Sequence, residues 1–406
     1  MAALDVFVRP LEPLFFGPTH SINAGENHHM HSLFPPPISA FQGLIRTRIL
    51  HAYPDLDLND FSSNARKQRE EKIGTPDRLP EGWQLNGPFP AAMNAERVQP
   101  WLPVPRALFA DRLNKPFYAY LLDNAQKGID DLNANLLGRP RQNALKPLGG
   151  WCSSANLSAF LFGEAESNWQ ASEWGRRPHF VVDDRQAGLA LDRKDGARSV
   201  NSRHGMLYFQ KRLRLKPGSG FLGGVSAALP SSIVNTGLAQ AAGVWGRKSR
   251  PVELSAVSES ELCPLWRKLL EGQHLERFKE TSESAQQLFW LVTLTPVFLD
   301  EPTQPLPRIN STAVEFECLA ALPGPPVVVG GYNLVHGSPR ANRKLLPAGS
   351  AWLFRLNGGD VEAQYRVLRN LNNAFPLGPI DEAAFGYGHT FVGIAPIDTD
   401  QTGESL

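Results

Sequence analysis

Glycine and proline interrupt the sequence at short intervals along its whole length, and this spacing most limits the folds open to the chain. The 406 residues include 35 glycines and 34 prolines, about 17% of the total against a typical ~12%. Both residues disfavour helix interiors, so their spread predicts many turns and argues against a helical bundle. Between the breaks, strand-like runs outnumber a few separate helical patterns. We therefore expect an α+β fold rather than a doubly wound one.

The first fifty residues are typical of a strand, a polar loop, a proline stop and a helix. Residues 4–16 form the strand pattern, and residues 17–30 are rich in His, Asn and Gly. Ser39 is a plausible N-cap for a helix over 40–51. Apolar residues recur on that helix at helical spacing, namely Phe41, Leu44, Ile45 and Ile49.

Later segments predict a domain division. Residues 57–85 are polar and charged, which indicates an exposed loop. In residues 180–216, apolar and polar side chains alternate on both sides of a polar tip, Lys194–His204, as in an extended β-hairpin. A buried strand pattern at Leu288–Leu299 could open a second domain. We expect an N-terminal domain over 1–280, with these two insertions, and a C-terminal domain over 281–406 that ends in a Gly-rich loop.

The overall charge hides an uneven distribution. The chain has 41 Lys and Arg residues against 40 Asp and Glu, a net +1 that by itself argues against a polyanion partner. Residues 185–216 nevertheless hold nine basic and two acidic residues, or +7, which leaves −6 for the remainder. Shorter basic stretches without acids lie at 139–146, 247–250 and 340–355. Because phosphates respond to local potential, these stretches keep a nucleic-acid partner open.

Catalytic, metal and membrane signals are weak. The three cysteines have no short spacing, and the histidines at 20, 28, 29 and 31 form no zinc-ligand pattern. Loop histidines occur at 20, 204 and 389, yet none stands beside a second titratable group in a motif. No Walker A or GxSxG motif is present. We expect no catalytic residues, cofactor or metal. Without an apolar run near ~18 residues or a signal peptide, we expect a cytoplasmic protein with no membrane partner.

Two turns combine glycine, a basic residue and an aromatic ring, the ingredients of a single-stranded RNA contact. They are Lys146–Trp151 and Trp245–Arg250, and a third loop, Gly386–His389, has glycine and tyrosine with histidine as its only possible charge. Each could instead be an ordinary glycine turn beside a core aromatic residue. Their coincidence makes RNA the leading class of partner.

The ordered motifs resemble a known family, the third subunit of the Cmr complex, which is the type III-B CRISPR effector of the RAMP superfamily. The resemblance spans nearly the whole chain. Its motifs, in order, are RPLEPLFFGPTHSINAGE with Gly43–Thr47, KPLGGW at Lys146–Trp151, DRQAGLALDRKDGARSVNSRHGMLYFQKRLRL, Gly243–Arg250, GGYN at Gly330–Asn333, PAGSAWLF at Pro347–Phe354, and the terminal GYGH. The GVWGRK loop departs from the commoner Gly-Gly-acidic pattern, which leaves the role of Trp245 open.

The resemblance implies two ferredoxin-like modules with antiparallel sheets, long insertions and an extended β-hairpin. It implies a non-catalytic subunit that grips the repeat-derived 5′ tag of the crRNA. It also implies contacts with the large polymerase-like Cmr subunit and the backbone Cmr subunit, and only an indirect relation to the target RNA. The hairpin tip could act as a thumb that displaces a base.

The expected RNA contacts follow from these motifs. Phosphate contacts are assigned to basic side chains: Arg46, Arg48, Lys146, Arg185, Arg198, Arg203, Arg247, Lys248 and Arg250. Backbone contacts are assigned to Gly149, Gly188, Gly246 and Gly388, and stacking to Tyr208, Trp245 or Tyr387, with His389 beside the last. For Arg46 and Arg48 a helix-surface ion pair is an equal alternative, and Tyr208 could be a core residue.

Two other functions remain open. The chain could be a metal-independent RAMP endoribonuclease that cuts CRISPR repeats, with His20 or His389 as the base. It could also be the equivalent tag-binding subunit of another CRISPR class, which would differ mainly in its partners.

Overall fold

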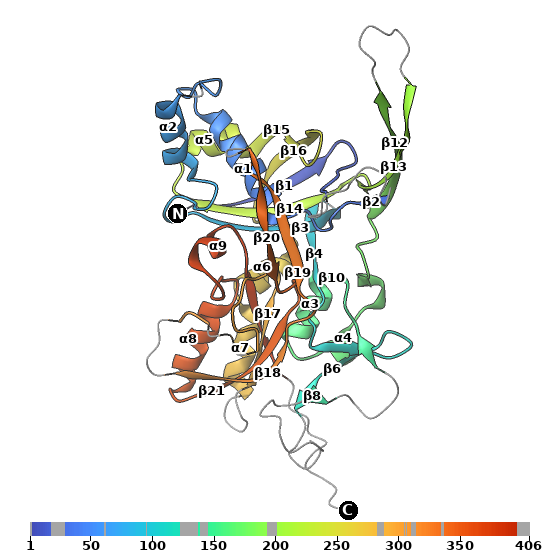
Figure 1. Cartoon of the computed structure of the whole chain (residues 1–406). Helices are drawn as coiled ribbons and strands as arrows, with labels where there is room; N and C mark the ends of the chain where they lie inside the picture. The colour runs from blue at the N-terminus through green and yellow to red at the C-terminus, as the bar shows by residue number, and fades with distance from the viewer. Residues whose placement is uncertain are drawn as a thin grey trace, which may run out of the picture. The chain divides into compact units, whose positions relative to one another are not determined.

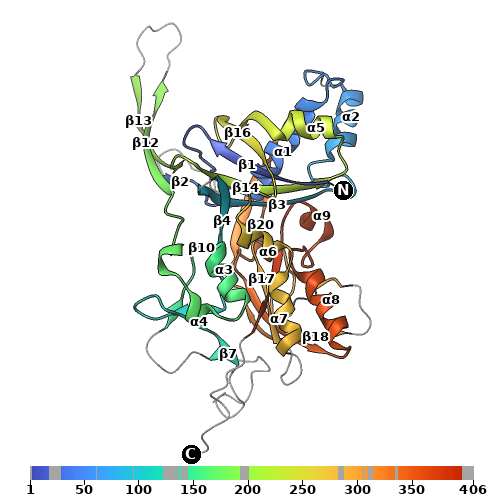
Figure 2. The ribbon, with the colours of Figure 1, turned by 180° about the vertical axis from the view of Figure 1, so that it is seen from behind.

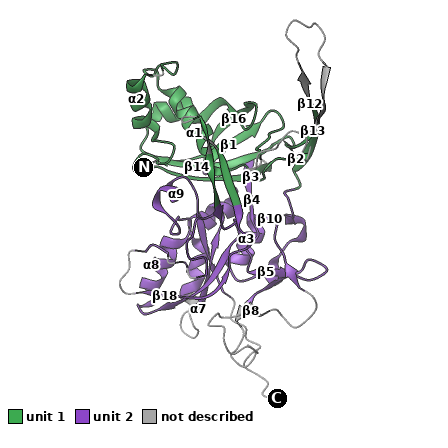
Figure 3. Cartoon of the chain, viewed as in Figure 1, with its two compact units in different colours: residues 1–96, 179–258, 328–343 green, residues 97–178, 259–327, 344–406 purple. Residues whose placement is uncertain are grey.

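A computed structural model describes residues 2–17, 29–60, 62–94, 96–121, 137–138, 145–192, 201–281, 288–303, 305, 307–309, 314–333 and 337–395 (Figure 1). The chain divides into two compact units, each assembled from three stretches of sequence (Figure 3). Unit 1 comprises residues 1–96, 179–258 and 328–343. Unit 2 comprises residues 97–178, 259–327 and 344–406.

Unit 1 contains an antiparallel sheet with strands in the order β3-β14-β1-β16-β15. Its strands are β1 (Ala2–Pro10), β3 (Gln84–Asn94), β14 (Ser219–Ala227), β15 (Gln240–Trp245) and β16 (Arg250–Val257). Helix α1 (Ile38–Ala52) follows β1, and α5 (Ser231–Val234) with the π-helical turn η3 (Asn235–Ala239) follows β14. With β15 as an added edge strand, this order and these crossovers are those of a ferredoxin-like fold.

The helix predicted over 40–51 is confirmed as α1. Phe41, Leu44, Ile45 and Ile49 are all buried, as their spacing requires. The predicted start is wrong by two residues, because the N-cap position is Pro37 and no side chain caps the helix.

Part of the segment predicted as an exposed loop is helical. Helix α2 (Ser63–Ile73) begins where the Ser62 hydroxyl accepts a hydrogen bond from the amide of Ala65, and it ends at Gly74. An Arg66–Glu70 ion pair one turn apart supports it. Only Ala65 is buried, so the helix has no apolar face that a sequence pattern could reveal.

The predicted hairpin is confirmed as β12 (Val181–Asp192) and β13 (Asn201–Leu215), and its described part extends away from the unit 1 sheet (Figures 1 and 2). A short strand, β2 (His29–His31), pairs with β13 in parallel. At the hairpin base, Leu14 and Leu213 exchange backbone hydrogen bonds of 2.8 Å, and Leu213 is buried. The hairpin is thereby joined to the chain that follows β1.

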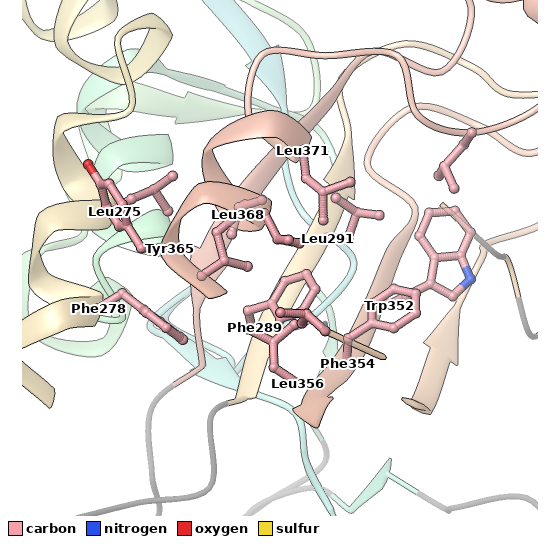
Figure 4. Close-up of a cluster of buried hydrophobic side chains, with 14 of the residues drawn as sticks. Leu275, Phe278, Phe289, Leu291, Trp352, Phe354, Leu356, Tyr365, Leu368 and Leu371 are labelled. Atoms are coloured by element: carbon pink, nitrogen blue, oxygen red, sulfur yellow. The ribbon is translucent and has the colours of Figure 1, made fainter. Parts of the chain in front are cut away.

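Unit 2 contains a second antiparallel sheet, ordered β18-β21-β17-β22. Its strands are β17 (Leu288–Thr293), β18 (Glu315–Leu322), β21 (Ala351–Asn357) and β22 (Thr390–Ile394), with helix α8 (Val361–Leu371) between the last two. This is again the ferredoxin-like order, but the described residues between β17 and β18 contain no helix. Phe289, Trp352 and Phe354 of the strands and Leu368 and Leu371 of α8 belong to one buried hydrophobic cluster (Figure 4).

The remaining elements of unit 2 are shorter strands and helical segments. Three strands pair as β4 (Arg97–Pro103), β10 (Trp151–Ser153) and β11 (Trp174–Gly175). Short strands are β5 (Leu108–Ala110), β6 (Pro116–Tyr118), β7 (Tyr120–Leu121), β8 (Leu137–Gly138) and β9 (Lys146–Pro147). Helical segments are α3 (Ser154–Leu161), α4 (Ala165–Asn168), η2 (Ala171–Glu173), α6 (Pro264–Leu270), η4 (Gln273–Leu275), α7 (Glu276–Thr281) and α9 (Ile380–Ala384).

One further hairpin, β19 (Val327–Asn333) with β20 (Ser338–Leu345), lies in sequence between β18 and β21, and its residues 328–343 belong to unit 1. The expected α+β fold with antiparallel sheets and an extended hairpin is confirmed. The compact units are interleaved in sequence, whereas the two ferredoxin-like arrangements follow one another within residues 2–257 and 288–394. The domain division at 280/281 therefore stays a prediction.

Candidate nucleic-acid interface

Much of the positive charge at the hairpin base is used within the hairpin. The Asp184 carboxylate accepts hydrogen bonds from Nε of Arg212 at 2.7 Å and from Nε and Nη2 of Arg214 at 3.0 and 2.6 Å. Lys211 pairs with Asp183 at 2.9 Å. Burial alone would raise the pKa of Asp184, but the hydrogen bonds from Arg214 and Arg212 hold it below its ordinary value. Because these cations are already paired with carboxylates, they are less available to phosphates than unpaired cations.

Arg185 differs from these neighbours. Its side chain is exposed and has no ion pair with any residue in the described part of the chain. Gly188 lies opposite Tyr208 across the hairpin, and the Tyr208 ring covers it so closely that an added Cβ would lie 2.1 Å from ring carbon Cζ. Tyr208 thus seals the backbone at Gly188. Arg198 and most of the tip lie outside the described residues, as does the side chain of Arg203, so the thumb stays a prediction.

The turn between β15 and β16 separates a buried ring from two exposed cations. Trp245 is only 3% exposed and packs edge-on against Phe16 and Phe221, with ring centroids 5.1 and 5.3 Å apart. Gly246 follows with a φ of +72°. Arg247 and Lys248 are exposed. Trp245 is a core residue in this structure, so its ring has no free face for a base, while the turn still presents charge.

Three other arginines near this sheet, Arg46, Arg48 and Arg250, contact other groups of the protein. Arg250 forms an ion pair with Glu12. Nη2 of Arg46 donates to the carbonyls of Gly74 and Thr75, both at 2.8 Å, which joins α1 to the loop after α2. Burial, and then the neighbouring Arg340, lowers the pKa of Arg46 to about 10.

Arg48 is half-buried. A Cβ added at Gly243 on β15 would lie 3.3 Å from Cδ of Arg48. Nε of Arg48 donates to the Gly237 carbonyl at 3.4 Å. The expected ion-pair alternative for Arg46 and Arg48 is replaced by contacts with backbone carbonyls.

In unit 2 the KPLGGW turn remains open to solvent at two positions. Lys146 is exposed on β9. Gly149 has a φ of +55°, and an added Cβ would meet nothing within 4 Å. Its carbonyl accepts a hydrogen bond of 2.8 Å from Nε1 of Trp174, which fixes the turn.

The terminal Gly-aromatic loop is buried in unit 2. Tyr387 is 8% exposed and contacts Phe298, with ring centroids 5.0 Å apart. The Gly388 amide donates to the Pro296 carbonyl at 2.9 Å, so it has no hydrogen left for a phosphate. Gly388 has a φ of +75°, and an added Cβ would lie 3.0 Å from Val297.

His389 is also part of this core. It is fully buried, its ring stacks on Phe375 at 4.8 Å, and its Nε2 lies 2.8 Å from Oδ1 of Asn373. Burial lowers its pKa to about 3. A neutral, enclosed imidazole cannot reach an RNA backbone in this conformation, which weakens the interpretation of His389 as a catalytic base. His20 lies outside the described residues.

Within the described residues, no group of three or more His, Cys, Asp or Glu side chains could hold a metal ion. In that same part of the chain, no helix has the length and apolar character to cross a membrane.

Each unit has a sheet in the ferredoxin-like order, and unit 1 also contains a long basic hairpin, which is the fold expected of a RAMP subunit. A family model described as CRISPR-associated protein (Cas_Cmr3) matches residues 6–395, so the chain belongs to this family. The match confirms the resemblance inferred from the ordered motifs. No curated protein matches the chain in sequence.

Solved structures resemble the chain over most of its length, but at low sequence identity. One is a cryo-EM structure of the Type III-B Cmr-beta bound to cognate target RNA, with 12% identity, a TM-score of 0.45, and coverage of 95% of this chain and 96% of the other. The same complex with AMPPnP gives 13% identity, a TM-score of 0.46 and 94% of each chain. A Csm3-Csm4 subcomplex of the type III-A interference complex gives 9% identity, a TM-score of 0.36, and 97% and 100%.

Proposed function

We propose that this chain is the non-catalytic subunit of a type III-B CRISPR effector that binds the repeat-derived 5′ tag of the crRNA. In that role it joins the large polymerase-like subunit to the backbone subunits, in the cytoplasm. The observation that carries the proposal is the family match over residues 6–395.

Exposed cations that form no ion pair with any described residue support an RNA contact in each unit. Arg185, Arg247 and Lys248 lie in unit 1, and Lys146 lies in unit 2 beside the open Gly149. Such side chains can attract phosphates without first breaking an ion pair. Arg46, Arg250 and the terminal loop are not part of the proposed contact, because each already has protein partners.

Co-expression with the large polymerase-like and backbone subunits tests the proposal. We expect a stable complex, and we expect affinity for an RNA carrying the repeat-derived tag to fall steeply as salt rises. A flat salt dependence, or no co-purification with either subunit, would contradict the proposal. Incubation of the chain with repeat RNA in EDTA tests the nuclease alternative, since site-specific cleavage lost in His20→Ala would favour an enzyme instead.

A further inference from the structure

A stacked aromatic pair lies at the base of the hairpin, on β2 and β13. Strands β2 and β13 lie side by side (Figures 1 and 2). Their parallel pairing sets His29 beside Phe209. The two rings stack with centroids 5.2 Å apart and planes 14° from parallel. Phe209 is 40% exposed, which is uncommon for a phenylalanine, and His29 is exposed as well. The pair therefore presents a ring surface to solvent.

Strand alternation places the ring pair and its sequence neighbours on opposite faces of the hairpin at this level. The neighbours of the pair, Met30 and Gln210, are only 8% and 7% exposed. His31 lies opposite Lys211 in the β2–β13 pairing, and Arg185 lies opposite Lys211 in the hairpin. Because side chains two residues apart share a face, Arg185 and His31 lie on the same face as the ring pair, and both are exposed.

The charges around the rings favour a phosphate-bearing ligand. On this face the one described acid, Asp183, is already paired with Lys211. Asp184 faces the other way and is held by Arg212 and Arg214. Arg185 is exposed without an ion pair in the described part of the hairpin. An aromatic surface with a neighbouring free cation matches single-stranded RNA, in which bases stack and phosphates attract arginine.

We propose that His29 and Phe209 form a stacking platform for one base of single-stranded RNA, with Arg185 contacting the adjoining phosphate. This inference rests on the proposed function and adds a base contact at the hairpin base, separate from the tip at 194–204. The tag sequence need not be known to test it.

The experiment uses repeat-derived tag RNAs in which 2-aminopurine replaces one base at a time, bound to the chain within its reconstituted complex. Stacking quenches 2-aminopurine, so we expect quenching at one or two adjacent positions. Phe209→Ala should abolish that quenching and weaken binding about tenfold to hundredfold, whereas Phe209→Trp should preserve both. Val244→Ala, which truncates a side chain 54% exposed on β15, is the matched control and should change neither.

The outcomes separate this inference from the proposed function. If the complex binds tag RNA and Phe209→Ala leaves both affinity and quenching intact, the platform is wrong while tag binding stands. If Phe209→Ala binds RNA normally but loses a neighbouring subunit, the face is a protein contact and the platform is again wrong. If the unaltered chain binds no tag RNA under any salt condition, the proposed function fails, and the platform with it.

Discussion

The turn at Trp245–Arg250 in unit 1 and the loop at Gly386–His389 in unit 2 have similar sequences and different surroundings. Both combine glycine with an aromatic ring and a basic or titratable side chain. In the first, the ring is buried but Arg247 and Lys248 are exposed. In the second, the ring, the glycine amide and the histidine all have protein partners. Sequence composition therefore identifies a close-packed turn. Whether the turn can bind a ligand depends on which of its rings, amides and charged side chains are free of protein partners.

The largest effect that would test this contrast is expected at Tyr387. Tyr387→Ala removes a buried ring from contact with Phe298, so we expect the free energy of unfolding to fall by about 3–5 kcal/mol. At temperatures where the variant is folded, its affinity for tag RNA should be unchanged. Chemical denaturation and RNA titration measure the two effects, with Tyr387→Phe as the control that keeps the ring. Weaker RNA binding at unchanged stability would reverse the assignment of this loop.

His389 provides the next test, through pH. Burial lowers its pKa to about 3, from an ordinary value near 6.5, so the folded state favours the neutral ring. As pH falls below about 6.5, the unfolded chain takes up the proton first and stability declines toward pH 3. We expect His389 to account for ~2 kcal/mol of lost stability between pH 7 and pH 4.5.

His389→Gln should start less stable at pH 7, because it loses stacking on Phe375, yet its stability should decline less steeply with acid. Denaturation curves at pH 7, 6, 5 and 4.5 measure both slopes. Some slope should remain, since burial also lowers the pKa of His274 in unit 2, to about 4. Equal slopes in the two proteins would mean that His389 is accessible to solvent protons in the folded state.

On the unit 1 side of the comparison, Arg247 and Lys248 should affect binding without affecting stability. Arg247→Gln with Lys248→Gln removes two exposed charges and leaves polar side chains in their place. The slope of log affinity against log salt is negative, and each lost phosphate contact makes it shallower by about 0.7 for single strands. We therefore expect the slope to become shallower by about 1.4. The free energy of unfolding should stay within about 0.5 kcal/mol. An unchanged salt slope would remove this turn from the interface.

The sequence predicted the elements whose patterns are local and strong. The apolar stripe of α1, the alternation of the hairpin arms and the buried strand β17 are each legible within a short window. Helix α2 was missed because its stability comes from a cap and an i,i+4 pair rather than an apolar face. Trp245 was assigned to stacking because a turn sequence carries no information on what packs over it.

The His29–Phe209 pair was missed for a different reason. Its two members are 180 residues apart and meet through a three-residue strand, β2, that has no recognisable sequence pattern. In the sequence alone, Phe209 is one apolar residue within a hairpin arm, and the histidines at 28, 29 and 31 raise only the question of a metal site. The sequence signal that could have directed attention to this face is an aromatic residue, Phe209, close to Lys211 and Arg212 in a predicted hairpin arm.

The smallest effect distinguishes available charge from total charge within one hairpin. Arg185 and Arg214 both have exposed side chains, but Arg214 is paired with Asp184 and Arg185 has no ion pair in the described hairpin. Arg185→Ala should weaken tag binding about threefold and lower the salt slope by about 0.7, with little change in stability. Arg214→Ala should leave the salt slope unchanged and cost at most about 1 kcal/mol of stability, because Arg212 still holds Asp184. Equal losses of affinity in the two variants would mean that RNA responds to the net charge of the hairpin, and that ion pairing within it does not decide which arginines bind.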